Sequence, residues 1–115
     1  TDYFTTAAAE RKKSREEALS LLEDTLKKAD IDAETKAAAT EKMTVIAERM
    51  EKESAIETLI KAKGFEKVIV IIGDNDTNIV VESDDLLPSQ ILQIQDAVTS
   101  QIEISLENIK IVNKK

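Results

Sequence analysis

The sequence predicts an α+β fold in which helices pack on one face of a three-stranded sheet, preceded by a long N-terminal helix. Two observations lead to this class. The first half of the chain lacks glycine and proline and spaces its apolar residues by three and four, as amphipathic helices do. From residue 54 onward the patterns follow the order helix, strand, strand, helix, strand. We therefore expect a helical stalk over residues 1–30 and an α+β domain over residues 31–115.

Residues 5–30 are predicted to form the stalk helix. Residues 10–17 are polar on every side, and the apolar stripe lies further along, at Leu19, Leu22, Leu26 and Ala29. A helix that packs at one end and is solvated at the other is typical of a stalk leading into a domain. A half-ordered terminus is the alternative interpretation, because unpacked helix ends are only marginally stable in water.

A second helix is predicted from about Ala33 to Met50, and a further helical segment begins at Ser54. The apolar face of the second helix is formed by Ala39, Met43, Ile46, Ala47 and Met50. Ser54 and Glu57 have the spacing of a capping box, which would start a separate helix after the polar joint at 51–53. The sequence does not decide whether the two segments form one kinked helix or two.

Gly64 is predicted to end that helical segment in the left-handed conformation, which glycine adopts without a steric penalty. Phe65 would then follow the stop and pack back onto Ile60, one helical turn earlier. The sequence thus predicts a helix docked directly against the strand that comes next.

The most apolar stretch, residues 68–72, is predicted to be a strand because all of its residues are β-branched. A polar turn at 73–78 leads to a returning strand at 79–81. Helices on one face of the sheet would require only alternate residues to be apolar. Either both faces of the first strand are covered, as in many central strands, or one face is an interface.

The C-terminal part predicts one more helix and one more strand. An acidic loop at 82–87 precedes Pro88, which favours the first position of a helix. The apolar stripe of that helix is Ile91, Ile94, Val98 and Ile102. The final strand is predicted at 107–113, where Ile109 and Ile111 alternate with mostly polar neighbours.

Composition excludes several classes of function. The chain has 115 residues and a net charge of −7, which argues against nucleic acids and anionic membrane surfaces as partners. It contains neither cysteine nor histidine, so disulfides, thiol chemistry and the usual neutral-pH base are excluded. A KH-type RNA module would need a Gly-x-x-Gly loop, which Gly64 and Gly73 cannot form. We expect no enzymatic activity and no cofactor.

One cation motif is considered and rejected. Asp74, Asp76 and Asn78 match the first half of a calcium loop, with Asp85 at its twelfth position. The sixth position is Ile79, where the sharp turn of such a loop needs glycine. A polar hairpin turn explains these residues better, and we expect no metal site.

Three segments resemble the soluble region of the stage III sporulation protein AH family of endospore-forming bacteria. They are residues 1–6 (TDYFTT), residues 41–44 (EKMT), and residues 57–61 (ETLIK) with the Gly64-Phe65 pair. None of these strings is a catalytic motif, so their order and spacing together carry the resemblance. The rest of the chain matches in pattern.

The resemblance implies a fold similar to the ring-building domains of type III secretion and flagellar basal-body proteins. It also implies a single-pass anchor in the mother-cell membrane that is absent from this sequence, and a soluble domain in the intermembrane space around the forespore. There, members of the family bind stage II sporulation protein Q as part of a channel complex. A homo-oligomeric ring is inferred from the fold alone, and a fold does not establish an assembly.

We therefore expect a non-enzymatic assembly module that binds stage II sporulation protein Q and forms a ring. Its contacts are expected around the helix-to-strand region, where a strand edge donates backbone hydrogen bonds and apolar residues anchor the partner. The predicted contact residues are Lys61, Lys63, Phe65, Lys67, Ile69 and Ile71. The alternative is an envelope domain that binds a small ligand or peptidoglycan fragment, which would need a concave pocket with convergent polar groups.

Overall fold

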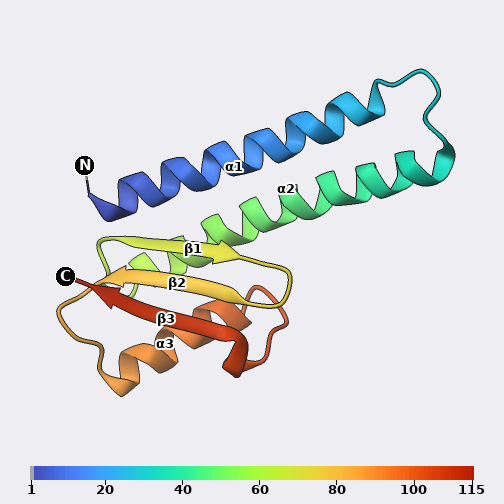
Figure 1. Cartoon of the computed structure of the whole chain (residues 1–115). Coiled ribbons are helices and arrows are strands. Elements are labelled where there is room, and N and C mark those ends of the chain that lie inside the picture. Colours follow the sequence, from blue (N-terminus) through green and yellow to red (C-terminus); the bar gives the residue numbers. More distant parts are fainter. Residues whose placement is uncertain (1) are drawn as a thin grey trace. The chain divides into compact units, whose positions relative to one another are not determined.

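A computed structural model describes residues 2–115 (Figure 1). The elements follow the order α1 (Tyr3–Leu26), α2 (Ala33–Lys61), β1 (Val68–Ile72), β2 (Thr77–Glu82), α3 (Pro88–Thr99), a 3-10 turn (Leu106–Asn108) and β3 (Ile109–Lys114). The chain divides into two compact units, a helical unit that extends to Met50 and an α+β unit that begins at Glu51. The division lies inside α2, whereas the sequence placed a boundary at residues 30 and 31.

α2 is one continuous helix, which decides between the two alternatives that the sequence left open, and the capped helix start predicted at Ser54 is wrong. The joint at 51–53 is Glu-Lys-Glu, residues with high helix propensity that continue the helix. The hydroxyl of Thr58 donates to the carbonyl of Ser54 at 3.0 Å, a bond typical of a helix interior. Ser54 therefore does not cap a helix, and the Glu57 carboxylate accepts a hydrogen bond from the Val70 N–H instead.

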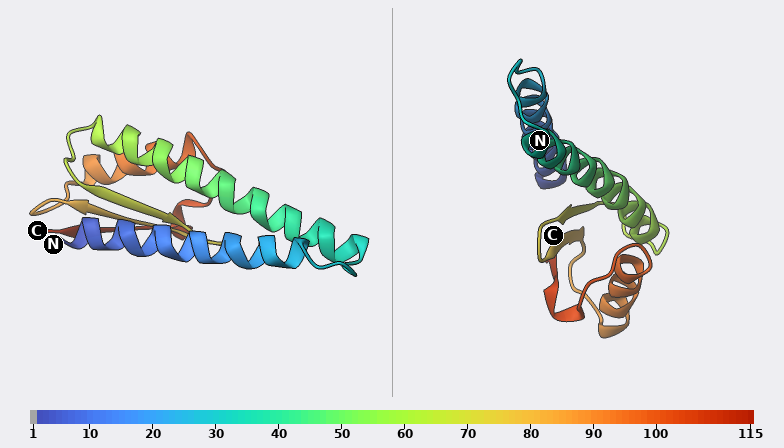
Figure 2. Two further views of the ribbon diagram at one scale, coloured as in Figure 1. Left: turned by 90° about the horizontal axis from the view of Figure 1, so that it is seen from above. Right: turned by 90° about the vertical axis from the view of Figure 1, so that its right-hand side faces the viewer.

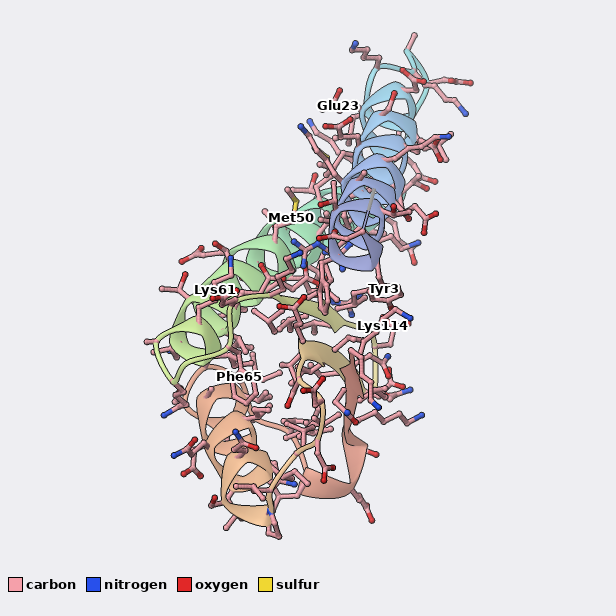
Figure 3. The ribbon with its side chains drawn as sticks, turned by 90° about the vertical axis from the view of Figure 1, so that its left-hand side faces the viewer. Tyr3, Glu23, Met50, Lys61, Phe65 and Lys114 are labelled. Carbon is pink, nitrogen blue, oxygen red and sulfur yellow. The ribbon has the colours of Figure 1, made fainter. Side chains whose placement is uncertain are left out.

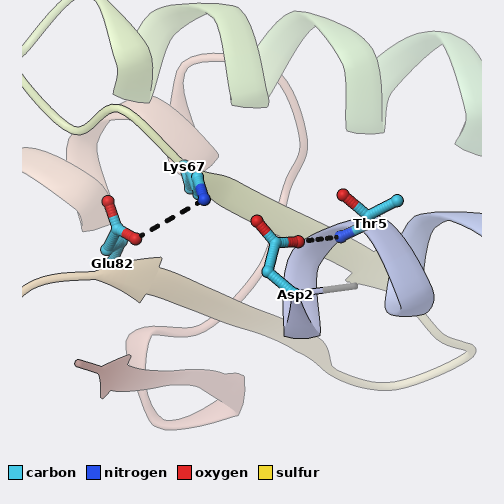
Figure 4. A network of polar contacts seen from close by, with 4 residues as sticks. All are labelled: Asp2, Thr5, Lys67 and Glu82. Atoms are coloured by element: carbon cyan, nitrogen blue, oxygen red, sulfur yellow. Dashed lines mark hydrogen bonds and ion pairs between the residues drawn. The ribbon is translucent and has the colours of Figure 1, made fainter.

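Both helices of the helical unit begin at an aspartate. The carboxylate of Asp2 accepts a hydrogen bond from the Thr5 N–H at 2.7 Å and caps α1 (Figure 4). Asp32 caps α2 in the same way, accepting from the Thr35 N–H at 2.7 Å. α1 ends at Leu26, earlier than predicted, and the chain turns between there and α2. None of the residues of α1 is buried.

The α+β unit contains a mixed sheet with the strand order β1-β2-β3. β1 and β2 form an antiparallel hairpin, and α3 connects β2 to β3, which runs parallel to it. Figure 2 shows α3 and the last turns of α2 on the same side of the sheet. β2 is the central strand, so β1 is an edge strand despite its apolar sequence.

The core lies between these two helices and one face of the sheet. Both helices contribute aliphatic residues that are nearly or completely inaccessible, and so do all three strands. The core residues are Ile56, Ile60, Phe65, Val68, Val70, Ile72, Ile79, Val81, Ile94, Ala97, Val98 and Ile109. This arrangement confirms the predicted fold class, with helices on one face of a three-stranded sheet.

Gly64 and Phe65 stand as predicted. Gly64 has a φ of 108° and follows the end of α2, while Phe65 joins Ile60 in the core. α3 begins at Pro88 but ends at Thr99, so Ile102 packs on the core from the loop beyond the helix. Within residues 2–115, no helix combines the length and apolarity that a membrane span requires.

Candidate interaction surface

The three predicted lysines lie at the surface where α2 gives way to β1. Lys61 is the last residue of α2, and Lys63 lies in the turn after it; both are exposed. Lys67 is partly exposed, and its ammonium lies 3.8 Å from the Glu82 carboxylate of β2 (Figure 4). Exposed ion pairs of this kind contribute about 0–1 kcal/mol, so Lys67 can exchange its partner at little cost.

Two of the three predicted apolar contact residues are buried. Phe65 is 6% exposed and belongs to the core, and Figure 3 shows it between the end of α2 and α3. Ile69 is 2% exposed. Ile71 is 38% exposed, so it alone of the three presents a side chain at the surface. The apolar part of the predicted contact is therefore reduced to Ile71.

The all-apolar sequence of β1 serves two faces. Val68, Val70 and Ile72 point into the core, whereas Ile69 and Ile71 point to the opposite face of the sheet. Ile69 is aligned with Val80 of β2, and Val80 is aligned with Val112 of β3, which is 57% exposed. The second face thus carries a row of β-branched side chains across all three strands, formed by Ile69, Val80 and Val112.

The outer edge of β1, which faces away from β2, is already hydrogen-bonded to side chains of α2. The Glu82 N–H donates to the Lys67 carbonyl at 2.9 Å, so by alternation the odd-numbered residues of β1 face β2. The N–H groups of Val70 and Ile72 consequently point away from the sheet. Two side chains of α2 accept them: Glu57 Oε2 lies 2.9 Å from the Val70 nitrogen, and Glu53 Oε2 lies 2.8 Å from the Ile72 nitrogen.

This pairing changes the expected use of β1. The sequence predicts that the edge of this strand donates backbone hydrogen bonds to a partner. In the structure, the outward N–H groups of Val70 and Ile72 are bound by carboxylates, so they are not available to an incoming strand. Contact through Ile71 would have to use its side chain.

The opposite edge of the sheet, at β3, is open. The Ser83 N–H donates to the Lys114 carbonyl at 3.0 Å, which places the even-numbered residues of β3 against β2. The peptide groups of Ile111 and Asn113 therefore face outward. No strand within residues 2–115 lies beyond them. Lys110 flanks this edge, with its ammonium 3.5 Å from the Asp76 carboxylate.

The hairpin turn forms the wall of a small hollow. Residues 72–77 and 102–104 line a volume of about 210 Å³. The hydroxyl of Thr77 is buried and has no hydrogen-bond partner.

Across the described part of the chain, no three carboxylates come together in a way that could hold a metal ion. The Gly73 N–H donates to the Asp76 carbonyl at 2.8 Å, so the acidic residues there belong to a tight turn.

Sequence reasoning missed Glu53 and Glu57. It assigned Glu57 to a capping box and left Glu53 in a polar joint. The signal was present in the spacing, because positions 53 and 57 share a helix face with the core residues Ile56 and Ile60. A carboxylate on the buried face of a helix needs hydrogen-bond donors, and the edge of a sheet supplies them. A prediction of one continuous helix through residues 51–53 would have placed both carboxylates on this face.

The fold defines an α+β domain of the ring-building type. The type III secretion protein EscJ of enteropathogenic E. coli has the same fold, with a TM-score of 0.57 and 24% identity over 84% of this chain and 66% of that one. The chain belongs to the SpoIIIAH-like protein family, whose model matches residues 1–111.

Two further similarities come from named members of this family. The chain is 32% identical over 102 residues to stage III sporulation protein AH of Bacillus subtilis (strain 168), covering 89% of this chain and 47% of that protein. It thus spans about half the length of that relative. The structure of the SpoIIQ-SpoIIIAH pore forming complex contains a chain that is matched with a TM-score of 0.84 and 26% identity, over 99% of this chain and 100% of that chain.

Proposed function

We propose that this chain is a non-enzymatic assembly module of a sporulation channel between mother cell and forespore, and that it binds stage II sporulation protein Q. The observation that carries the proposal is the match over 99% of the chain to the structure described as the SpoIIQ-SpoIIIAH pore forming complex. Membership of the SpoIIIAH-like family supports it. A domain that recognises a protein partner needs an accessible surface and no reactive groups.

The proposal includes a location. The chain would be held to the mother-cell membrane by a single-pass anchor outside residues 1–115, and would reach into the space around the forespore. Its net charge of −7 is consistent with a domain that does not lie on an anionic lipid surface. A ring of copies is a further part of the proposal and follows only from the ring-building fold.

We place the contact with the partner on the exposed members of the predicted set and on the open edge of the sheet. Lys61, Lys63, Lys67 and Ile71 offer positive charge and one apolar side chain. β3 offers the outward peptide groups of Ile111 and Asn113, which an extended strand could pair with. The closed edge at β1 is left out of this proposal.

The test is size-exclusion chromatography with light scattering on this chain, alone and mixed with the soluble domain of stage II sporulation protein Q. We expect a new species at the summed mass, with a dissociation constant on the order of 10 μM or tighter. Separate elution at higher concentrations would contradict partner binding. Sedimentation of the chain alone over a concentration series measures its self-association and thereby tests the ring.

A charge reversal then tests the proposed surface. Lys61→Glu with Lys63→Glu should weaken complex formation, because both side chains are exposed beside β1. Lys27→Glu with Lys28→Glu is the matched control, since it makes the same change of charge at the exposed end of α1. Equal weakening by both pairs would mean that long-range attraction, and not this surface, drives the association.

Binding of a small ligand gains no support from the structure. The hollow beside the hairpin turn measures about 210 Å³. Pockets for small molecules are typically about 300–1,000 Å³ and largely apolar. Asp74 and Asp76 line this hollow, so it resembles a turn with its surrounding solvent more than a binding pocket.

A further inference from the structure

β1 combines the two properties that make a strand prone to pair with another copy of itself. Its sequence, Val-Ile-Val-Ile-Ile, is uncharged and entirely β-branched, and it lies at the edge of the sheet. Exposed edges of this composition are templates for strand addition between molecules. Neither proline nor lysine, the residues that commonly protect an edge, occurs within the strand.

The protection comes from α2. Glu53 and Glu57 are one helical turn apart. On β1, the N–H groups that point away from β2 belong to Val70 and Ile72, which are two residues apart. The helix repeat of about 5.4 Å approaches the strand repeat of about 6.6 Å for two residues, so both carboxylates can meet both donors. Glu53 is 1% exposed and its bond to Ile72 is buried.

We infer that Glu53 and Glu57 close the β1 edge against a second copy of this chain. Pairing of β1 with β1 would require the Val70 and Ile72 N–H groups, which are the ones the carboxylates hold. An incoming strand would have to displace two charge-assisted hydrogen bonds. It would also separate the buried Glu53 carboxylate from the Ile72 N–H, and the loss of a hydrogen bond by a buried polar group is costly.

The consequence is an asymmetric sheet. One edge is closed by side chains of the same unit and the other, at β3, can accept a strand. Strand addition at β3 therefore ends after one partner and cannot propagate through the sheet. This inference does not depend on which protein the domain binds, since it concerns only copies of this chain.

The experiment removes the hydrogen-bond acceptor at Glu57, which is more accessible to solvent than Glu53. Glu57→Ala deletes the carboxylate, whereas Glu57→Gln keeps an oxygen acceptor in the same place and serves as the control. Amide hydrogen exchange is followed by NMR at Val70, with Ile79 of the central strand as the internal reference. In Glu57→Ala we expect the Val70 amide of the monomer at low concentration to exchange about tenfold faster or more, because its hydrogen bond to a charged group is lost.

Self-association is measured on the same variants. At concentrations on the order of 100 μM, we expect Glu57→Ala to sediment as dimers and larger species while wild type and Glu57→Gln do not form them by this route. Adding Ile71→Lys to Glu57→Ala should restore the wild-type behaviour, because it places a charge on β1. Adding Val112→Lys on β3 should not restore it.

Three results would overturn the inference. The first is a Val70 amide that exchanges equally in Glu57→Ala and Glu57→Gln. The second is a folded Glu57→Ala variant that sediments as wild type does. The third is an association that Val112→Lys abolishes and Ile71→Lys leaves intact, since that would place it at β3. Circular dichroism confirms that each variant is folded before these comparisons are made.

Discussion

The helical unit and the α+β unit bury their residues very differently. Among the described residues up to Met50, Ala39 is the one hydrophobic residue classed as buried, whereas the remaining buried hydrophobics lie between Ile56 and Ile109. The α+β unit thus contains a core of mostly aliphatic side chains. The helices of the first unit depend more on intrinsic propensity and on capping by Asp2 and Asp32.

This difference explains why the two units respond to different kinds of change. Core packing contributes several kcal/mol per large side chain, whereas caps and surface positions contribute about 1 kcal/mol or less. Substitutions in the α+β unit should therefore act through cavities and buried polar atoms. Substitutions in the helical unit should act locally, near the helix ends.

The largest effect is expected at the centre of the sheet. Ile79 of β2 is 0% exposed, so Ile79→Ala should lower the free energy of unfolding by about 2–5 kcal/mol. Leu21→Ala on α1 removes a similar side chain that is 69% exposed, and should change it by less than about 0.5 kcal/mol. Urea denaturation of both variants measures the contrast. Similar losses in the two would mean that α1 is packed as tightly as the sheet.

A gain in stability is expected next to Ile79. The Thr77 hydroxyl is buried without a partner, so Thr77→Val keeps the shape of the side chain and removes the cost of an unpaired polar group. We expect unfolding to require about 1–3 kcal/mol more. Thr77→Ala is the comparison, because it removes the hydroxyl but also creates a cavity. A melting temperature that falls in Thr77→Val would show that the hydroxyl is satisfied in solution.

The end of α2 should be more sensitive than the end of α1. Gly64 has a φ of 108°, and a Cβ there would meet no atom within 4 Å, so Gly64→Ala tests backbone strain alone. We expect a loss of about 1–2 kcal/mol by thermal unfolding. Lys27 at the end of α1 has ordinary right-handed geometry, so Lys27→Ala should be close to neutral. Equal effects would remove the special role assigned to Gly64.

The smallest effect is a local dependence on pH at the start of α2. The side-chain and backbone hydrogen bonds with Thr35 hold the pKa of Asp32 below its ordinary value of 3.8. Since the pKa is lower in the folded state, the contribution of this cap is complete above the unfolded pKa. It is lost as the pH falls through the folded pKa.

An NMR titration of the Thr35 amide measures this dependence. We expect the amide shift to follow the Asp32 carboxyl, with a midpoint below 3.8. Asp32→Asn keeps a capping oxygen and should abolish the titration. A midpoint at or above the ordinary value would contradict the hydrogen bond as the cause.

Much of the α+β unit could be predicted from the sequence. The strands, the proline that starts α3 and the glycine that ends α2 are local signals, and each stands near its predicted position. The position of β1 in the sheet could not be predicted. An all-apolar run is equally compatible with a central strand and with an edge strand whose second face is also shielded from water.

The candidate surface was harder to predict than the fold. Lys61, Lys63 and Ile71 are exposed as a contact would require, but Phe65 and Ile69 are buried, because apolar type alone does not distinguish a core position from an anchor. The role of Glu53 and Glu57 depends on hydrogen bonds across 19 and 13 residues of chain. Such long-range partners become visible only when helix and sheet are placed together.

The connection through α3 has a consequence for the order in which the sheet forms. β1 and β2 are joined by a short turn, and hairpins of this kind close in about 1–10 μs. β3 pairs with β2 only after α3 has crossed the sheet, a non-local contact with a higher entropic cost of closure. We expect the hairpin to form early and the accepting edge to appear late. A partner strand that docks at β3 would therefore select chains whose folding is already complete.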